Sequence, residues 1–315
     1  MKKVLITGGC GFIGSHIIEK LNEFQYDITV IDNLCSSSIK INNNLLKNVK
    51  FHIENVSDYQ WKPKKFDLII HLASPVGPSG ILKYSGLMAK YMLDDIYHII
   101  EGSTINKCPI IFFSTSEIYG YRETCVELKE NDDKLLIGDY KVRNEYSMSK
   151  LLCEIVLNNT SKVKNIQYQI IRPFNVSGHR QLKDNGFVLP TFVLQSLNNE
   201  DITVFGNGEQ LRSFTHVKDI VDGVFLIIGC KKMNQIWNIG EPKNKCSILN
   251  LAKKVKSITN SSSKIVFVDP KKIHGPLYEE AWDKIPNSNK IKNELGWKAQ
   301  YSIDEIIKSV VDYYS

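Results

Sequence analysis

The sequence lacks the features that mark several classes of protein. No apolar run approaches the roughly 18 residues that a membrane-spanning helix requires. The apolar stretch after Met1 begins too early and holds too many glycines for a signal peptide. Seven cysteines are scattered without a CxxC pair, so neither a disulfide framework nor a zinc site is indicated. These absences predict a cytoplasmic protein with reduced thiols and no membrane association.

Charge and histidine spacing argue against two further classes. The formal net charge is +6, but the lysines are spread along the chain without the concentrated basic and aromatic segments of nucleic-acid binders. His179, His216 and the remaining histidines show no metal-ligand spacing. The 315 residues, 43% of them hydrophobic, are expected to fold as one large domain or two closely packed ones.

Glycine is concentrated near the N-terminus, in "VLITGGCGFIGSHI". The pattern predicts a buried strand at Val4–Ile6 and a helix at Phe12–Leu21, with a glycine-rich turn between them. At such a turn, the backbone N–H groups and the dipole of the helix N-terminus favour the pyrophosphate of a dinucleotide. An ordinary glycine turn gives the same pattern, so the interpretation depends on the next strand of the chain.

A second predicted strand, "DITVIDNL" at 27–34, supports the dinucleotide interpretation. It contains Asp32, close to the offset of about 20 residues at which an acidic residue binds the ribose. A carboxylate there accepts hydrogen bonds from the 2′-hydroxyl of NAD and repels the 2′-phosphate of NADP. No arginine comes soon after it, which favours NAD. The alternative is an aspartate that simply ends a strand.

Further apolar segments alternate with helical ones along the first half of the chain. Nearly continuous apolar strands of this kind indicate a parallel sheet covered by helices on both faces, the Rossmann-type doubly wound α/β fold. The additional predicted strands span 49–53, 67–72, 110–114 and 168–171.

Candidate catalytic residues come after the strand predicted at 110–114. "STSEIYG" leaves this strand where ligands of open α/β sheets bind, and "YSMSK" places Tyr146 and Lys150 on one face of a helix. An ammonium group near a phenol lowers the pKa of the phenol. Tyr146 is therefore predicted to take a proton from a sugar hydroxyl, with Lys150 near the nicotinamide ribose and Thr115 orienting the substrate. A solvent-exposed Tyr–Lys face is the alternative.

Together these motifs resemble the extended short-chain dehydrogenase/reductase family, in its nucleotide-sugar epimerase, dehydratase and decarboxylase branch. Besides the motifs above, "HLAS", "RPFNVSGHRQ", "VFGNGEQLRSFTHVKD", "NIGEP" and "ELGWKAQ" occur in the family's order. The resemblance implies NAD as cofactor, a nucleotide sugar, expected to be UDP-linked, as substrate, and a homodimer packed through helices near 85–102 and 146–158. It implies an NAD-binding Rossmann domain at 1–175 and a smaller C-terminal α/β substrate lobe at 176–315, with some segments returning to the sheet.

The resemblance also assigns individual residues. Thr115, Ser116, Glu117, Tyr146 and Lys150 are expected to be catalytic. Substrate contacts are expected from Asn175, from Arg212 as a phosphate or sugar ligand, and from Phe205, which is either near the nucleotide base or in the core. Besides Tyr146 and Lys150, the expected NAD contacts are Gly8, Gly11, Phe12, Ile13, Gly14, Asp32, Asn33, Asn55, Val56, Leu72, Ala73, Ser74 and Pro173.

The residues after Thr115 bear on the reaction, because members of this branch share a first oxidation at C4 of the sugar and then diverge. In the 4,6-dehydratases the triplet is Thr-Asp-Glu, where the aspartic acid protonates the leaving hydroxyl. Ser116 is a poor proton donor by comparison. The sequence therefore favours a UDP-glucuronate decarboxylase-like enzyme, then a 4-epimerase of a UDP-hexuronate or UDP-hexose, then a dehydratase. A catalytically idle NAD-binding regulator is the alternative of another class.

Several departures from the family pattern limit what can be said of the substrate. "MLDDIYH" at 92–98 replaces the usual Asn-Val-x-Gly-Thr-x-Asn, and the loop "PVGPSGILKYSG" at 75–86 suggests a remodelled wall over the sugar. Lys284 stands where a second phosphate-binding arginine is common. These changes leave the identity of the sugar open.

Overall fold

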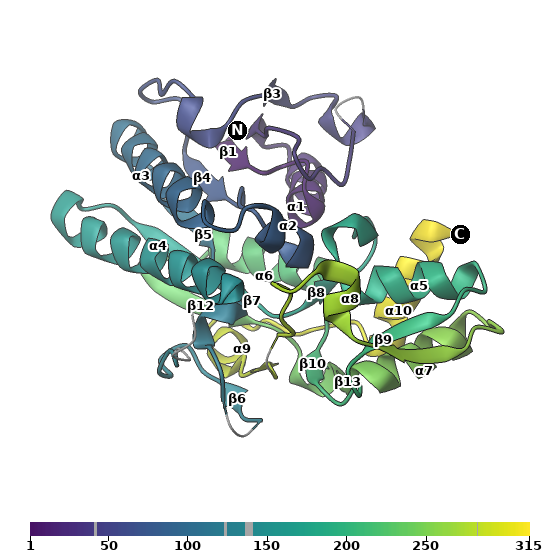
Figure 1. The fold of residues 1–315 in the computed structure, drawn as a ribbon. Coiled ribbons are helices and arrows are strands. Elements are labelled where there is room, and N and C mark those ends of the chain that lie inside the picture. The colour runs from purple at the N-terminus through teal and green to yellow at the C-terminus, as the bar shows by residue number, and fades with distance from the viewer. Residues whose placement is uncertain (41–42, 123–124, 136–140, 282) are drawn as a thin grey trace.

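A parallel sheet organises the computed structural model, which describes residues 1–40, 43–122, 125–135, 141–281 and 283–315. Seven strands of the described chain adopt the spatial order β12-β7-β5-β4-β1-β2-β3 (Figure 1). The order reverses between β1 and β4, which is the switch point of a doubly wound Rossmann fold. The strands are β1 (Lys3–Thr7), β2 (Asp27–Ile31), β3 (Lys50–His52), β4 (Leu68–His71), β5 (Ile110–Phe113), β7 (Tyr168–Pro173) and β12 (Gln235–Ile239).

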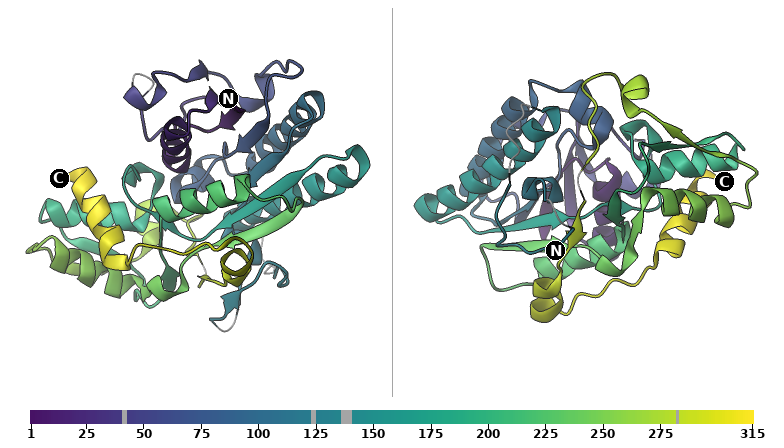
Figure 2. Two further views of the ribbon diagram at one scale, coloured as in Figure 1. Left: turned by 180° about the vertical axis from the view of Figure 1, so that it is seen from behind. Right: turned by 60° about the horizontal axis from the view of Figure 1, so that its bottom comes forward.

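Helices cover both faces of this sheet, as the apolar strands require (Figure 2). On one face α1 (Phe12–Glu23) packs against α6 (Val217–Ile228), and on the other α3 (Met88–Asn106) packs against α4 (Val142–Lys164). Successive strand residues supply the two cores: Ile6 lies in the core under α1 and α6, and Leu5 in the core under α3 and α4. The Rossmann-type fold predicted from the sequence is confirmed.

After β7, the described chain returns to the sheet once. Strand β12 pairs in parallel with β7, and its Trp237 is fully buried in the core under α1 and α6. Helix α9 (Asn289–Leu295) lies against β12. The central sheet is therefore built from both halves of the sequence.

A smaller group of elements lies beside the sheet (Figure 1, lower right). Helices α5 (Val188–Leu197), α7 (Ile248–Ile258) and α10 (Ile303–Tyr314) share a third core with β9 (Ile202–Phe205). A capping box, in which Ser302 and Glu305 satisfy each other's backbone N–H groups, begins α10.

Short elements complete the described chain. Four small two-stranded sheets pair β6 (Glu127–Leu128) with β15 (Ile285–Pro286), β8 (Val176–Ser177) with β11 (Thr215–His216), β9 with β14 (Ile265–Val268), and β10 (Leu211–Ser213) with β13 (Lys245–Ser247). The remaining α-helices are α2 (Gly77–Lys83) and α8 (Pro270–His274).

Candidate active site

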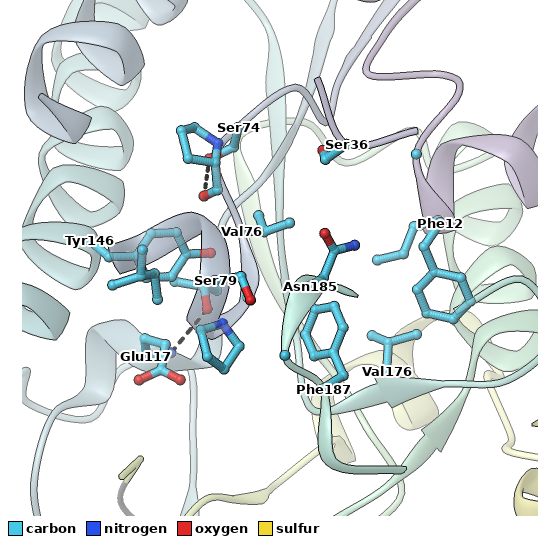
Figure 3. Close-up of a pocket in the computed structure, with 18 of the residues that line it drawn as sticks. Phe12, Ser36, Ser74, Val76, Ser79, Glu117, Tyr146, Val176, Asn185 and Phe187 are labelled. Atoms are coloured by element: carbon cyan, nitrogen blue, oxygen red, sulfur yellow. Dashed lines mark hydrogen bonds between the residues drawn. The ribbon is translucent and has the colours of Figure 1, made fainter. Parts of the chain in front are cut away.

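A cavity of about 1040 Å³ runs along the carboxyl ends of the central strands and continues to the group formed by α5 and α7. Every residue predicted from the sequence for the site lines this cavity. Figure 3 shows Tyr146 and Glu117 on the left, Phe12 on the right, Val76 and Asn185 between them, and Ser36 above Asn185. The structure therefore brings the predicted residues together along one cavity.

The glycine-rich turn joins β1 to α1 with almost no space between its backbone segments. Gly8 has a φ of +70°, and a Cβ on it would lie 2.8 Å from the backbone N of Ala73. A Cβ on Gly14 would lie 2.3 Å from the carbonyl oxygen of Gly8. Helix α1 begins with no side-chain cap and no acidic residue in its first turn. Its N-terminus is thus open to an anionic group, which is what a dinucleotide pyrophosphate requires.

Asp32 stands one residue beyond β2, at the edge of the same cavity. Its carboxylate accepts hydrogen bonds from the backbone N–H groups of Cys10 and Leu34, both at 2.8 Å. Burial raises the pKa of Asp32, and these two bonds oppose that rise. The carboxylate is thus bound to Cys10 of the glycine turn and lines the same cavity, and the turn and Asp32 together fit an adenosine dinucleotide.

Tyr146, Lys150 and Thr115 meet where β5 ends and α4 begins. The ammonium of Lys150 donates a hydrogen bond to the carbonyl oxygen of Phe113 at 2.9 Å, and burial lowers its pKa to about 8. The phenol of Tyr146 is hydrogen-bonded to Thr115. The predicted juxtaposition of the three side chains is present.

The predicted direction of the Tyr146 pKa is wrong for this structure. Burial raises the pKa of the phenol, while the hydrogen bond to Thr115 and the positive charge of Arg143 lower it only in part. Lys150 does not contribute to this lowering. The physical reason is that Tyr146 and Lys150 are both buried and the ammonium group is bonded to Phe113.

Glu117 lies between two buried cations at the other end of the catalytic group. Its Oε1 accepts a hydrogen bond from Arg143 at 3.1 Å and another from Lys284. Burial alone would raise the pKa of Glu117, but Lys284 and Arg143 lower it to about 2. Burial lowers the pKa of Lys284 to about 8, against the opposing effect of Glu117. Glu117 is therefore ionised at neutral pH, and its trio with Arg143 and Lys284 has one positive charge in excess.

Two polar atoms of this trio are buried without a hydrogen-bond partner, namely Oε2 of Glu117 and Nε of Arg143. Unsatisfied buried polar groups are costly and are concentrated where a ligand completes the hydrogen bonding. Both residues line the cavity. The protein itself thus leaves the hydrogen bonding of this trio incomplete beside the cavity.

The three predicted substrate contacts have partners within the protein. Arg212 donates to Oε1 of Glu280 at 2.9 Å and to the carbonyl oxygen of Ala281 at 2.5 Å. The amide of Asn175 donates to the carbonyl oxygen of Ser213 at 3.4 Å. Phe205 packs edge-to-face against His274 and Tyr278 while still lining the cavity. Their roles as substrate ligands stay predictions.

Arg143 is a site residue that the sequence motifs did not identify, and Lys284 has a different contact from the one expected. Lys284 contacts Glu117, whereas the resemblance suggested a position for binding phosphate. Arg143 stands three residues before Tyr146, which places both on one face of α4. That spacing is the one signal in the sequence that points to Arg143. For Lys284, no local signal exists, because its partner is far away in the chain.

The fold and the site define a Rossmann-type enzyme that binds a nicotinamide dinucleotide and carries a Tyr-Lys-Thr group beside it. The chain belongs to the NAD-dependent epimerase/dehydratase family, whose model matches residues 4–240. The resemblance stated from the sequence is thereby confirmed, and NAD is the cofactor of the family.

Known relatives align with almost the whole of this chain. A UDP-N-acetyl-α-D-glucosaminuronate decarboxylase of Bacillus cytotoxicus is 30% identical, over 99% of this chain and 98% of that one. A UDP-glucuronic acid decarboxylase 1 of Danio rerio is 27% identical, over 100% of this chain and 73% of that one. A UDP-glucose 4-epimerase of Thermotoga maritima, solved with UDP-glucose, is 27% identical with a TM-score of 0.86, over 99% and 98% of the two chains.

Among the described helices, none combines the length and the apolar character that crossing a membrane requires.

The charge pairing around Glu117 predicts a large effect of removing its charge. Substitution Glu117→Gln leaves Arg143 and Lys284 buried without a counter-ion, so we expect a loss of about 3–5 kcal/mol in the free energy of unfolding. Glu294→Gln is the matched control: Glu294 and its partner Lys232 are 36% and 59% exposed, so we expect a loss below about 1 kcal/mol. Urea denaturation at about pH 7 measures both.

The stabilisation that ionised Glu117 contributes depends on pH. The pKa of Glu117 falls from 4.5 to about 2 on folding, so the stabilisation is complete above about pH 4.5 and is lost as the pH falls toward 2. The difference between the wild type and Glu117→Gln should therefore be constant between about pH 7 and 5 and shrink below that range. Equal losses for the Glu117 and Glu294 variants at neutral pH would contradict the pairing.

Proposed function

We propose that this protein decarboxylates a UDP-linked hexuronate, using bound NAD to oxidise C4 of the sugar. The observation that carries the proposal is the state of Glu117, which is held ionised between Arg143 and Lys284. The excess positive charge of this trio favours a substrate with an additional carboxylate over a neutral hexose. The names of the two decarboxylases similar to this chain, both of which act on uronates, support the same choice.

In this proposal, different parts of the cavity bind the cofactor and the substrate. Residues 1–175 are proposed to bind NAD, through the glycine turn and Asp32, and residues 176–315 to supply most of the substrate lobe. NAD, when bound, would accept the hydride from C4 and supply a positive charge that lowers the pKa of a nearby phenol. Tyr146, once ionised, takes the proton of the C4 hydroxyl, and Thr115 orients this hydroxyl through the oxygen that contacts Tyr146.

The charged groups around Glu117, at the other end of the cavity, promote the loss of CO₂. Once C4 is a ketone, the C6 carboxylate is β to it, and its carbon–carbon bond breaks with the electron pair passing to an enolate at C4 and C5. Glu117 is ionised and cannot donate the proton that C5 then needs. The ammonium of Lys284, with a pKa lowered to about 8, is a suitable donor. The hydride would then return to C4 from the bound cofactor, and Tyr146 gives its proton back to the C4 oxygen, which completes a UDP-pentose.

A 4-epimerase is the second candidate. The Thermotoga structure and a UDP-N-acetylglucosamine 4-epimerase of Methanobrevibacter ruminantium, 26% identical and solved with UDP-N-acetylmuramic acid, have TM-scores of 0.86 over 99% of this chain. Epimerisation needs the same Tyr146, Lys150 and Thr115 but no use of a carboxylate. A dehydratase is less well supported, because Ser116 stands where that reaction needs an acid. A regulator without activity does not explain the buried Tyr146–Thr115 contact.

We also propose a homodimer, as the family resemblance implies, formed through α3 and α4. These two helices lie side by side on one face of the sheet (Figure 1). Large apolar side chains on them are exposed, including Tyr97 at 56%, Leu152 at 42% and Ile155 at 46%. Contiguous exposed apolar groups commonly mark an interface between chains. The cytoplasmic location stays a prediction from the sequence.

The substrate prediction is tested with three nucleotide sugars. We expect UDP-glucuronate or UDP-N-acetylglucosaminuronate, but not UDP-glucose, to give a product lighter by one CO₂, detected by mass spectrometry together with released CO₂. NAD is regenerated in each turnover, so no net NADH accumulates. A product of unchanged mass but different retention would favour the epimerase, and turnover of UDP-glucose alone would contradict a uronate substrate.

The role of Tyr146 is tested with Tyr146→Phe. Loss of the phenolic oxygen removes the proposed base, so we expect kcat to fall on the order of 10²- to 10⁴-fold. NAD retained by the purified protein should not change, because the glycine turn and Asp32 are intact. Tyr121→Phe, at an exposed tyrosine, is the control. Near-normal turnover by Tyr146→Phe would rule out this base.

The dimer is tested with Ile155→Glu. A carboxylate on the apolar face of α4 should dissociate the dimer. Size-exclusion chromatography coupled to light scattering should then give the molar mass of a monomer. Phe267→Glu, at a similarly exposed side chain on β14, should leave the dimer intact. A monomeric wild type would contradict the proposal.

A further inference from the structure

The segment between β4 and α3 forms one wall of the cavity. We call residues 75–87 the wall segment; it contains α2, and its residues Pro75, Val76, Ser79 and Tyr84 line the cavity. In Figure 3, Val76 and Ser79 lie between Tyr146 on one side and Asn185 on the other. A substrate that reaches Tyr146 therefore passes along this wall segment, whose sequence departs from the family pattern.

One end of the wall segment packs directly on the opposite side of the cavity. Gly77 has a φ of +74°, and a Cβ on it would lie 2.6 Å from the carbonyl oxygen of Asn185. Gly186 has a φ of +77°, and a Cβ on it would lie 3.1 Å from both Pro78 and Ser79. This end is therefore held by close backbone packing, which leaves the other end to be fixed independently.

The other end precedes α3, whose N-terminus has no cap of its own. The residue before the helix, Leu87, makes no side-chain cap hydrogen bond, and the first turn contains no acidic residue. The first N–H groups of a helix have no partner within the helix, so they need one from elsewhere. Helix α3 has 19 residues and covers the sheet, so N–H groups without partners at its start would destabilise the fold.

Glu145, on α4, supplies those partners. Its Oε2 accepts a hydrogen bond from the backbone N–H of Gly86 at 2.6 Å, and its Oε1 accepts one from Met88 at 2.9 Å. The N–H of Ala89 approaches the same Oε1 at 3.5 Å. A carboxylate at this place also interacts favourably with the positive end of the helix dipole. One side chain therefore fixes both the end of the wall segment and the start of α3.

Glu145 is adjacent to Tyr146 in the sequence, so its contact with the wall segment affects the space beside Tyr146. We infer that Glu145 is a positioning residue that holds the wall segment at a set distance from Tyr146, so that the sugar fits between them. Tyr146, Lys150 and Thr115 are held by contacts of their own, with one another and with Phe113. Loss of Glu145 is then expected to weaken substrate binding more than the chemical step. The inference rests on the proposed function.

The test compares Glu145→Ala with Glu305→Ala. Glu305 is a carboxylate that likewise accepts a bond from a backbone N–H at a helix N-terminus, from Ser302 at 2.8 Å, but it lies on α10. We expect Glu145→Ala to raise the KM for the uronate on the order of tenfold, while kcat changes much less and retained NAD does not change. Glu145→Gln keeps an amide oxygen as acceptor and should restore part of the affinity. Glu305→Ala should leave KM unchanged.

A second measurement does not depend on turnover. Amide hydrogen exchange in residues 75–89 should become faster in Glu145→Ala and stay as in the wild type in Glu305→Ala. If the wild type acts on no nucleotide sugar, the proposed function fails while this exchange result still tests the contact. If the wild type is active but Glu145→Ala matches Glu305→Ala in KM and in exchange, the inference is overturned and the proposed function stands.

Discussion

The site depends on one buried hydrogen bond, from the ammonium of Lys150 to the carbonyl oxygen of Phe113 at 2.9 Å. Phe113 is the last residue of β5, so the bond fixes α4 against the end of a strand in the middle of the sheet. Thr115 lies two residues after that strand, and Tyr146 precedes Lys150 by about one turn of α4. Because both flanking segments are rigid, this bond sets the distance at which Tyr146 meets Thr115.

The same contact explains why the charge on Lys150 is maintained in a buried place. Burial lowers its pKa to about 8, which still leaves the amine mostly protonated at neutral pH. A buried ammonium without a partner would be strongly destabilising. The carbonyl of Phe113, together with nearby carboxylates such as Asp95, offsets part of that cost. The positive charge of Lys150 therefore remains at the end of β5, while those of Arg143 and Lys284 lie beside Glu117.

Local patterns explain why much of this architecture is predictable from the sequence. The strand, glycine turn and helix at the N-terminus are encoded within about 20 consecutive residues, and the position of Asp32 is set by the length of the next strand. The Tyr146–Lys150 pair is a helical spacing. By contrast, the partners of Glu117 are 26 and 167 residues away, and Glu145 caps a helix that begins 57 residues earlier. The raised pKa of Tyr146 results from burial, which depends on packing that no short motif encodes.

The distribution of unusual residues gives these long-range contacts a functional meaning. The glycine turn, Asp32 and the Tyr-Lys-Thr group keep the family pattern, and in the proposed function they serve the oxidation by NAD. The wall segment and Lys284 depart from the pattern, and in the proposed function they contact the substrate. Glu145, on the helix that carries the base, ties the altered wall to the unaltered machinery by hydrogen bonds of 2.6 and 2.9 Å. A chain of this kind can therefore change the sugar that it accepts and the step that follows oxidation without disturbing the oxidation itself. The condition is that a contact such as that of Glu145 keeps the altered wall segment at a fixed position relative to the base.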